Sequence, residues 1–65
     1  MKIRYFEDTD TLLIELKPGI AAEARDLDEN TLLDLDAHGQ VLAITLEHAT
    51  ARAELCSFSF DRVAA

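Results

Sequence analysis

Hydrophobic and polar residues alternate with a period of two along most of the chain, which is the pattern of half-buried β-strands. Residues 2–6 (KIRYF) and 11–16 (TLLIEL) flank the polar stretch EDTD, so they are predicted to form a hairpin. A second hairpin is predicted for residues 31–36 (TLLDLD) and 41–47 (VLAITLE). Residues 21–27 (AAEARDL) are rich in alanine and charge, and we expect a weak strand there, at an edge of the sheet.

The period changes after residue 47, where the stretch HATARAELC contains neither glycine nor proline. Thr50 is expected to be the N-cap of a short helix that begins at Ala51. The whole pattern predicts an α+β fold, in which a small antiparallel β-sheet of four to five strands is followed by this short C-terminal helix. A chain of 65 residues has room for one small domain, residues 1–65.

The tail at residues 57–65 (SFSFDRVAA) fits two conformations. Phe58 and Phe60 alternate with serine as in a strand, whereas Leu55 and Phe58 have the spacing of a helix. The pattern therefore leaves the conformation of this tail open.

A turn with special residues separates the first hairpin from the weak strand. In Lys17-Pro18-Gly19-Ile20, proline fixes φ at the second position and glycine is free to take a positive φ at the third, which is type II chemistry. Because a type II turn splays the strands of a hairpin, we expect a connection wider than a tight hairpin loop.

The stretch DLDAHG (34–39) resembles the start of a calcium loop, which has oxygen ligands at its first positions and glycine at the sixth. The twelfth position would then be Thr45, although Ca²⁺ needs a bidentate glutamate there. The fifth position would be His38, a nitrogen donor. We therefore expect residues 36–39 to form a type I turn that closes the second hairpin, with Gly39 in the left-handed region.

The bulk properties of the chain limit its class. A chain this short buries only about 60% of its unfolded surface, and its one cysteine cannot form an intrachain disulfide, so we expect oligomerisation or a metal to add stability. The net charge is −7 and the six basic residues are scattered, which argues against nucleic-acid and membrane-surface binding. The charged N-terminus, the short apolar runs and the single cysteine favour a cytoplasmic location.

Candidate chemistry is sparse. His38 and His48 stand at opposite ends of one predicted strand, about 30 Å apart, so one chain cannot bring both to a metal ion. Cys56, beside apolar residues, is expected to act as a small apolar packing residue. The acidic residues at positions 7, 8 and 10 lie in a polar turn, where burial cannot separate their pKa values for acid–base catalysis. We predict no catalytic residue, no cofactor and no metal site, and hence no enzyme.

Apolar residues occur at both parities of the predicted strands. One short helix covers only one face of a sheet, so the other face needs a second cover, and the simplest is another copy of the chain. The expected homodimer interface comprises Phe6, Leu13, Leu32, Val41, Phe58 and Phe60. The competing interpretation is that isolated apolar residues are ordinary on a protein surface.

Two blocks of the sequence resemble a small, mainly bacterial family of unknown function, DUF2283. The first block comprises Met1, Lys2, Ile3, Tyr5, Asp10, Leu12, Ile14 and Leu16. The second comprises Leu33, Asp34, Asp36, Gly39, Val41 and Ile44, and Ala49-Thr50 resembles the start of the family's C-terminal helix. The chain departs from the pattern at Ala43, at Thr45 and from Cys56 onward. The resemblance implies a small antiparallel sheet with a C-terminal helix, and no functional residue can be carried over from it.

Two functional hypotheses follow. The first is an acidic, cytoplasmic, homodimeric β-sheet module that acts through protein contacts, as an accessory or regulatory partner of an unidentified protein. The alternative is a small-molecule or metal-binding protein, or a minor enzyme, whose site is built at the subunit interface from His48 and carboxylates of two chains.

Overall fold

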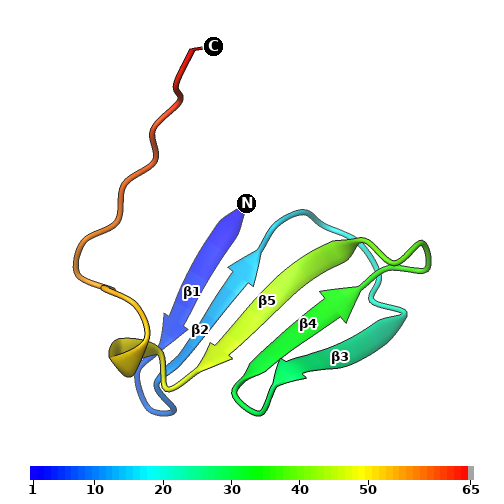
Figure 1. The fold of residues 1–65 in the computed structure, drawn as a ribbon, viewed down its shortest axis with the longest axis horizontal. Coiled ribbons are helices and arrows are strands. Elements are labelled where there is room, and N and C mark those ends of the chain that lie inside the picture. Colours follow the sequence, from blue (N-terminus) through cyan, green and yellow to red (C-terminus); the bar gives the residue numbers. More distant parts are fainter. Residues whose placement is uncertain (65) are drawn as a thin grey trace.

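The computed structural model describes residues 1–64, which form five strands and one turn of 3₁₀ helix (Figure 1). The elements are β1 (Lys2–Phe6), β2 (Thr11–Glu15), β3 (Glu23–Asp28), β4 (Thr31–Leu35), β5 (Val41–Glu47) and η1 (Ala49–Ala51). The strands form one sheet in the order β1-β2-β5-β4-β3, and every neighbouring pair is antiparallel. Both predicted hairpins, the weak edge strand and the predicted fold class are confirmed. Residue 65 of the predicted tail lies outside the described residues.

The central strand is β5, which pairs with β2 on one side and with β4 on the other. In the sheet, β5 and β4 lie between β2 and β3. Residues 16–22, which connect β2 to β3, therefore cross the ends of β5 and β4 (Figure 1). Two backbone hydrogen bonds fix this crossing, from Leu16 N to Leu42 O at 2.7 Å and from Ala22 N to Leu35 O at 2.8 Å. The wide connection predicted at Pro18 is thus confirmed.

The turn between β4 and β5 is built around Asp36 and Gly39. The Asp36 Oδ1 atom accepts backbone hydrogen bonds from His38 at 2.8 Å and from Gln40 at 2.9 Å. These N–H donors, Gln40 first, lower the pKa of the Asp36 carboxyl. Gly39 has a φ of 80°, and its N–H donates to Asp36 O at 3.1 Å. The predicted hairpin turn is therefore confirmed, and the Asp36 carboxylate is used by the turn itself.

A β-bulge interrupts the alternation at the start of β5. Asp34 pairs with Ala43 and Leu35 pairs with Val41, so Leu42 has no partner on β4. Directly paired residues share a face of the sheet, which places Val41 on the face of Leu35. The prediction that Val41 shares a face with Leu13 and Leu32 was therefore wrong, because a strict period of two does not anticipate the extra residue.

The extra residue is held in place by the crossing segment. Leu42 is buried, and a Cβ atom on Gly19 would lie 2.9 Å from Leu42 Cδ2. The close approach needs a residue without a side chain, so Gly19 lets the crossing segment lie directly on Leu42.

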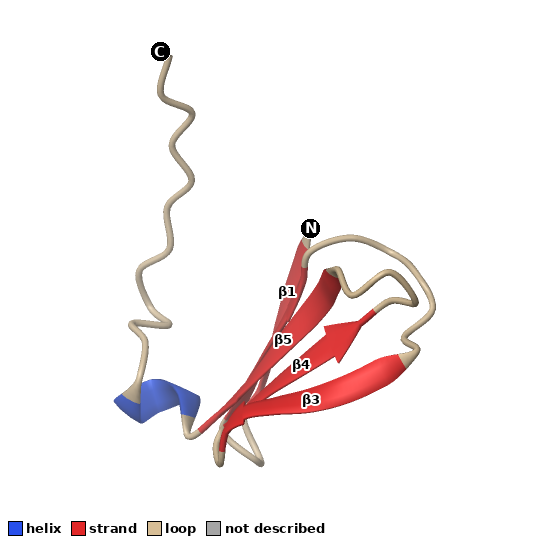
Figure 2. Cartoon of the chain, turned by 45° about the vertical axis from the view of Figure 1, so that its right-hand side comes forward, coloured by secondary structure: helices blue, strands red, loops and turns tan. Residues whose placement is uncertain are grey.

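The sheet forms a single layer. Figure 2 shows η1 at one end of it and no second layer over the strands. The buried apolar residues are few: Leu12, Leu35, Leu42, Ala43 and Ala49. The radius of gyration is 13.0 Å, whereas a compact domain of this length has about 10.7 Å, and the extended segment after η1 contributes to the difference (Figure 1). Since stable domains are built from at least two packed layers, the described chain lacks half of a normal core.

We expect Gly39→Ala to lower the free energy of unfolding by about 1 kcal/mol. A Cβ atom at Gly39 would meet no other atom within 4 Å, so the cost comes from the left-handed backbone alone. Gly39→Asn should cost less, because asparagine tolerates this region. Urea unfolding measures both, and adding calcium to the native chain should leave the melting temperature unchanged. A rise of several degrees with calcium would contradict the hairpin assignment.

Candidate interaction surface

One face of the sheet carries continuous apolar rows. The register places Ile3, Ile14, Ile44 and Leu33 side by side across four strands. A parallel row holds Tyr5, Leu12, Leu46 and Thr31. We call the surface formed by these two rows the isoleucine face. Cross-strand neighbours of this kind are the contacts that stabilise a sheet, and here they make one apolar strip from β1 to β4.

The isoleucine face is incompletely covered. The exposed fraction is 40% for Ile3 and 37% for Tyr5, and Ile14, Ile44 and Leu33 are half-buried. The η1 turn covers only the end of the sheet, where Ala49 is completely buried. The sequence-based argument had assigned a helix to cover this face. A single 3₁₀ turn is too short to do so, and the more apolar of the two faces is therefore left without a covering layer.

The opposite face mixes apolar and charged residues. Its central row reads Arg4, Leu13, Thr45, Leu32 and Asp26 from β1 to β3. We call this the mixed face. Leu13 and Leu32 are half-buried and are separated by the Thr45 side chain.

The six predicted interface residues do not form one patch. Three of them, Phe6, Leu13 and Leu32, belong to the mixed face, and Val41 belongs with Leu35 on the other. Phe58 and Phe60 lie in the C-terminal segment and are 73% and 74% exposed.

A groove runs along the isoleucine face beside β1. One wall comprises Ile3, Tyr5, Leu12 and Ile14 from β1 and β2, and the other comprises Ala53, Glu54, Leu55 and Phe58. Its volume is about 390 Å³. With Glu54 as the one charged residue of this lining, the groove suits an apolar side chain better than an ion or a polar substrate.

Asp10 fastens the segment after β5 to the first hairpin. Its backbone lies in the left-handed region with a φ of 53°, and its Oδ1 accepts hydrogen bonds from Tyr5 Oη at 2.7 Å and from Thr50 N at 3.1 Å. Thr50 Oγ1 donates to Oδ2 at 2.8 Å, and Ala49 N donates to Asp10 O at 3.0 Å. The Tyr5 hydrogen bond, followed by that of the Thr50 hydroxyl, lowers the pKa of Asp10, and the same bond raises the pKa of Tyr5.

The predicted role of Thr50 as a helix N-cap is wrong. Thr50 lies inside η1, and the N-cap is His48, which has a φ of 56° and makes no side-chain capping bond. The physical reason is the Asp10 carboxylate, which offers the Thr50 hydroxyl a charged acceptor from another part of the chain.

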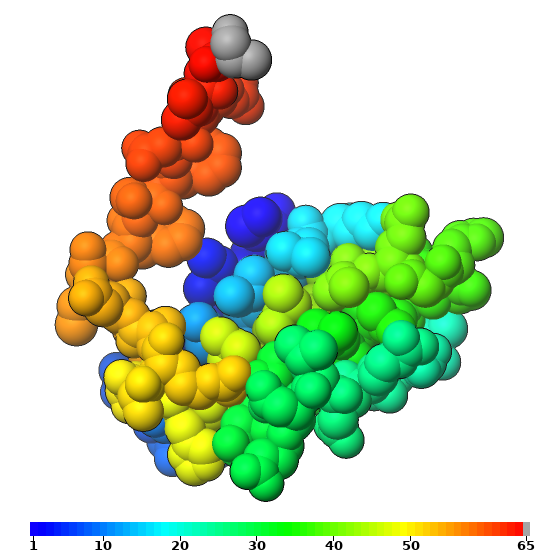
Figure 3. Space-filling view, viewed as in Figure 1, coloured from blue at the N-terminus to red at the C-terminus, as the bar shows by residue number. Residues whose placement is uncertain are grey.

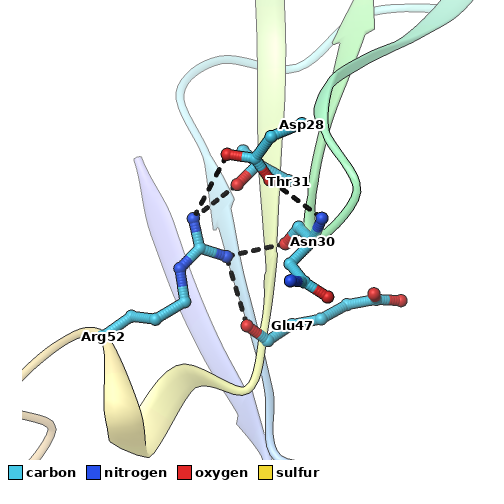
Figure 4. Close-up of polar contacts among 5 residues, drawn as sticks. All are labelled: Asp28, Asn30, Thr31, Glu47 and Arg52. Carbon is cyan, nitrogen blue, oxygen red and sulfur yellow. Dashed lines mark hydrogen bonds and ion pairs between the residues drawn. The ribbon is translucent and has the colours of Figure 1, made fainter.

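Arg52 fastens the same segment to the far half of the sheet (Figure 4). Its Nη1 donates to Asn30 O at 2.7 Å and to Glu47 O at 3.2 Å, and its Nη2 donates to the Thr31 hydroxyl. Asp28 Oδ2 lies 3.9 Å from Nη2. Thr31 is only 5% exposed, so the guanidinium supplies a hydrogen bond to a buried polar side chain.

Sequence reasoning missed the roles of Asp10 and Arg52. Asp10 offered one signal, because aspartate is enriched among the residues that adopt a positive φ. Arg52 offered none, since its partners are set by how β3, β4 and β5 lie together.

The other candidate residues remain apart. His38 is exposed in the turn before β5, and His48 is exposed after its end. Cys56 is exposed, so its predicted packing role was wrong: the chain leaves the sheet after Ala53. Within residues 1–64, no three histidine, cysteine or acidic side chains gather as a metal site would require. Nor does this part of the chain contain a helix with the length and hydropathy to span a bilayer.

We expect Asp10→Asn to lower stability at neutral pH but not in acid. The Asp10 pKa is lowered from 3.8 on folding, so its contribution is complete above that value and is lost as the pH falls through the folded pKa. The difference in unfolding midpoint between native chain and variant should therefore shrink towards pH 2. Asp8→Asn is the control, because Asp8 makes no side-chain hydrogen bond in the described chain. Tyr5 is the one tyrosine, and its alkaline titration should move to lower pH in the Asp10 variant.

Arg52→Ala should cost about 1–3 kcal/mol of unfolding free energy, because the buried Thr31 hydroxyl and two carbonyl groups lose a charged donor. Arg52→Lys should recover only part of this loss. Lysine keeps the positive charge, but its ammonium group cannot donate to these separate acceptors as the forked guanidinium does. Arg4→Ala on the mixed face is the control and should change stability by less than about 0.5 kcal/mol. Equal stability of the Arg52→Ala and Arg4→Ala variants in urea unfolding would show that the guanidinium contacts contribute nothing.

One family match covers the part of the chain that forms the sheet. No curated protein and no solved structure matches the chain. The model of one family, described as "Protein of unknown function (DUF2283)", matches residues 2–49, which include all five strands and the start of η1. The match covers well over half of the 65 residues, and the chain therefore belongs to the DUF2283 family.

Proposed function

We propose that this chain is a homodimeric protein-interaction module of the cytoplasm, which serves as an accessory or regulatory partner, and that the isoleucine face packs against a second copy. The observation that carries the proposal is the row Ile3, Ile14, Ile44 and Leu33, which crosses four strands under no second layer. Two sheets that pack face to face lie about 10 Å apart and share one core, and this arrangement supplies the missing layer.

The surface area of the chain supports a second copy as the cover. The accessible surface is 5244 Å², whereas a compact monomer of 7.2 kDa exposes about 4,100 Å². The excess of about 1,100 Å² is larger than the roughly 800 Å² that each partner buries in a standard interface. Burial of the isoleucine face together with the extended C-terminal segment, residues 54–64, would therefore bring each chain of a dimer towards the exposure of an ordinary folded protein.

The charges also favour the isoleucine face over the mixed face. At the β3 end of the isoleucine face, Arg25 pairs with Glu23 at 3.0 Å, and Arg52 lies 3.9 Å from Asp28. Two copies with a net charge of −7 can thus meet there with their local charges compensated. The mixed face carries more negative than positive side chains: Glu15, Asp26, Asp34 and Glu47 against Lys2 and Arg4. Like charges brought together at an interface cost free energy.

A second candidate function is the binding of a small apolar molecule. The groove of about 390 Å³ lies within the 300–1,000 Å³ that ligand sites occupy, and its lining is mainly apolar. Native mass spectrometry of protein purified from its own host separates the two candidates. A bound ligand adds its own mass to that of the chain, whereas a dimer has twice the mass of one chain.

We expect Ile44→Asp to weaken the dimer at least about 30-fold, the loss for a central interface residue. Thr45→Asp is the matched control, because it places the same charge on the neighbouring residue of β5 but on the mixed face. Sedimentation measures association, and the melting temperature of the native chain should rise with protein concentration.

Two outcomes would contradict this proposal. A monomer at high micromolar concentration, with a melting curve independent of concentration, would reject the dimer. The other contradicting outcome is normal association of Ile44→Asp together with lost association of Thr45→Asp or of the Leu13→Asp, Leu32→Asp double variant. This result would show that the interface is the mixed face.

A further inference from the structure

Resting on the dimer proposed above, we propose that the two copies exchange their C-terminal segments, so that residues 55–60 of each chain seat in the groove of the other. We call residues 54–64 the arm. The exchange gives the exposed phenylalanines of the arm a place to pack: the partner's arm covers the β1 and β2 part of the isoleucine face, and the partner's sheet covers the β5 and β4 part.

The arm is unattached beyond its first residues. The last backbone hydrogen bond of the segment runs from Ala53 N to Ala49 O at 2.9 Å, and within the described chain none involves residues 54–64. Figure 3 shows the arm standing clear of the sheet, with an open hollow between it and the N-terminal strand. Yet the arm carries three exposed apolar side chains: Phe58, Phe60 and Val63. An extended segment with this composition gains free energy when a surface covers it.

The groove offers such a surface. Its sheet wall is Ile3, Tyr5, Leu12 and Ile14, while its outer wall is the chain's own arm, including Leu55 and Phe58. A second hollow, lined by Met1, Ile3, Phe58 and Phe60, shares Ile3 and Phe58 with the groove and prolongs it along β1. The space between the sheet and the arm is open, so a segment from another molecule can enter it.

The fixed exit of the arm favours exchange over closure on its own sheet. Asp10 and Arg52 hold residues 48–53 against both halves of the sheet, so the arm leaves at a set position and stands off from β1. In a two-fold dimer, a contact of arm to groove is made twice, once in each direction, and the assembly is closed. A symmetry axis beside the groove brings each arm to the partner's groove.

Cys56 in the arm provides the test, because it is the one cysteine of the chain and is exposed. An isotopically labelled native chain is mixed with an unlabelled Ile3→Cys, Cys56→Ser chain, and the mixture is mildly oxidised. A disulfide between the two cysteines then joins different molecules by construction. We expect this covalent heterodimer, identified by its mass, to form at least about ten times faster than with the control chain Arg4→Cys, Cys56→Ser, whose cysteine is on the mixed face.

Each outcome decides a separate point. Equal rates with Ile3→Cys and Arg4→Cys, in a chain that sediments as a dimer, would reject the exchange and leave the dimer intact. The single variant Ile3→Cys keeps Cys56 in the same chain. If it forms an intrachain disulfide while the mixture forms no heterodimer, the arm packs on its own sheet. As an independent check, Phe58→Ser with Phe60→Ser should weaken association at least about tenfold, whereas Val63→Ser, outside the groove lining, should not. Unchanged association of the double variant would also overturn the exchange.

Discussion

The pairing of β2 with β5 is the interaction on which the rest of the structure depends. Each hairpin alone is a two-stranded ribbon, which is marginal in water. The contacts of Leu12 with Leu46 and of Ile14 with Ile44 join the two hairpins into one sheet. The same pairing forces residues 16–22 to cross the sheet end, and it brings the end of β5 next to the β1–β2 turn. Asp10 can therefore reach Thr50, forty residues away along the chain.

The fastening of residues 48–53 links this sheet to the proposed assembly. Asp10 belongs to the first hairpin, whereas the partners of Arg52 belong to β3, β4 and β5. Asp10 and Arg52 therefore attach residues 48–53 both to the first hairpin and to the part of the sheet formed by β3, β4 and β5. They use polar side chains near the end of the sheet and leave the apolar rows in its middle free. The sheet is stiffened at one end while its isoleucine face stays open to a partner.

Much of the fold could be predicted because its causes are local. The alternation in KIRYF and TLLIEL is a property of adjacent residues, and Gly39 adopts the positive φ that its turn needs. The bulge at Leu42 could not be predicted, since it depends on Gly19 of a crossing segment. Thr50 was misassigned because its hydrogen-bond acceptor, Asp10, is distant in the sequence. Cys56 was misassigned because its apolar neighbours in the sequence do not bury it in the structure. The open face was missed because the sequence pattern does not reveal that η1 is a single turn, Ala49–Ala51.

The odd number of strands has a consequence for the two outer strands, β1 and β3. In a five-stranded antiparallel sheet the outermost strands run in the same direction, so translated copies could meet only as parallel neighbours, the weaker ladder. A copy rotated about the normal of the sheet could pair antiparallel, but β1 would then meet β1, with Lys2 and Arg4 on both sides. Likewise β3 would meet β3, with its Glu23, Asp26 and Asp28 carboxylates. Repulsion between like charges therefore opposes the antiparallel pairing of like borders, even though each border is an uncovered backbone ladder.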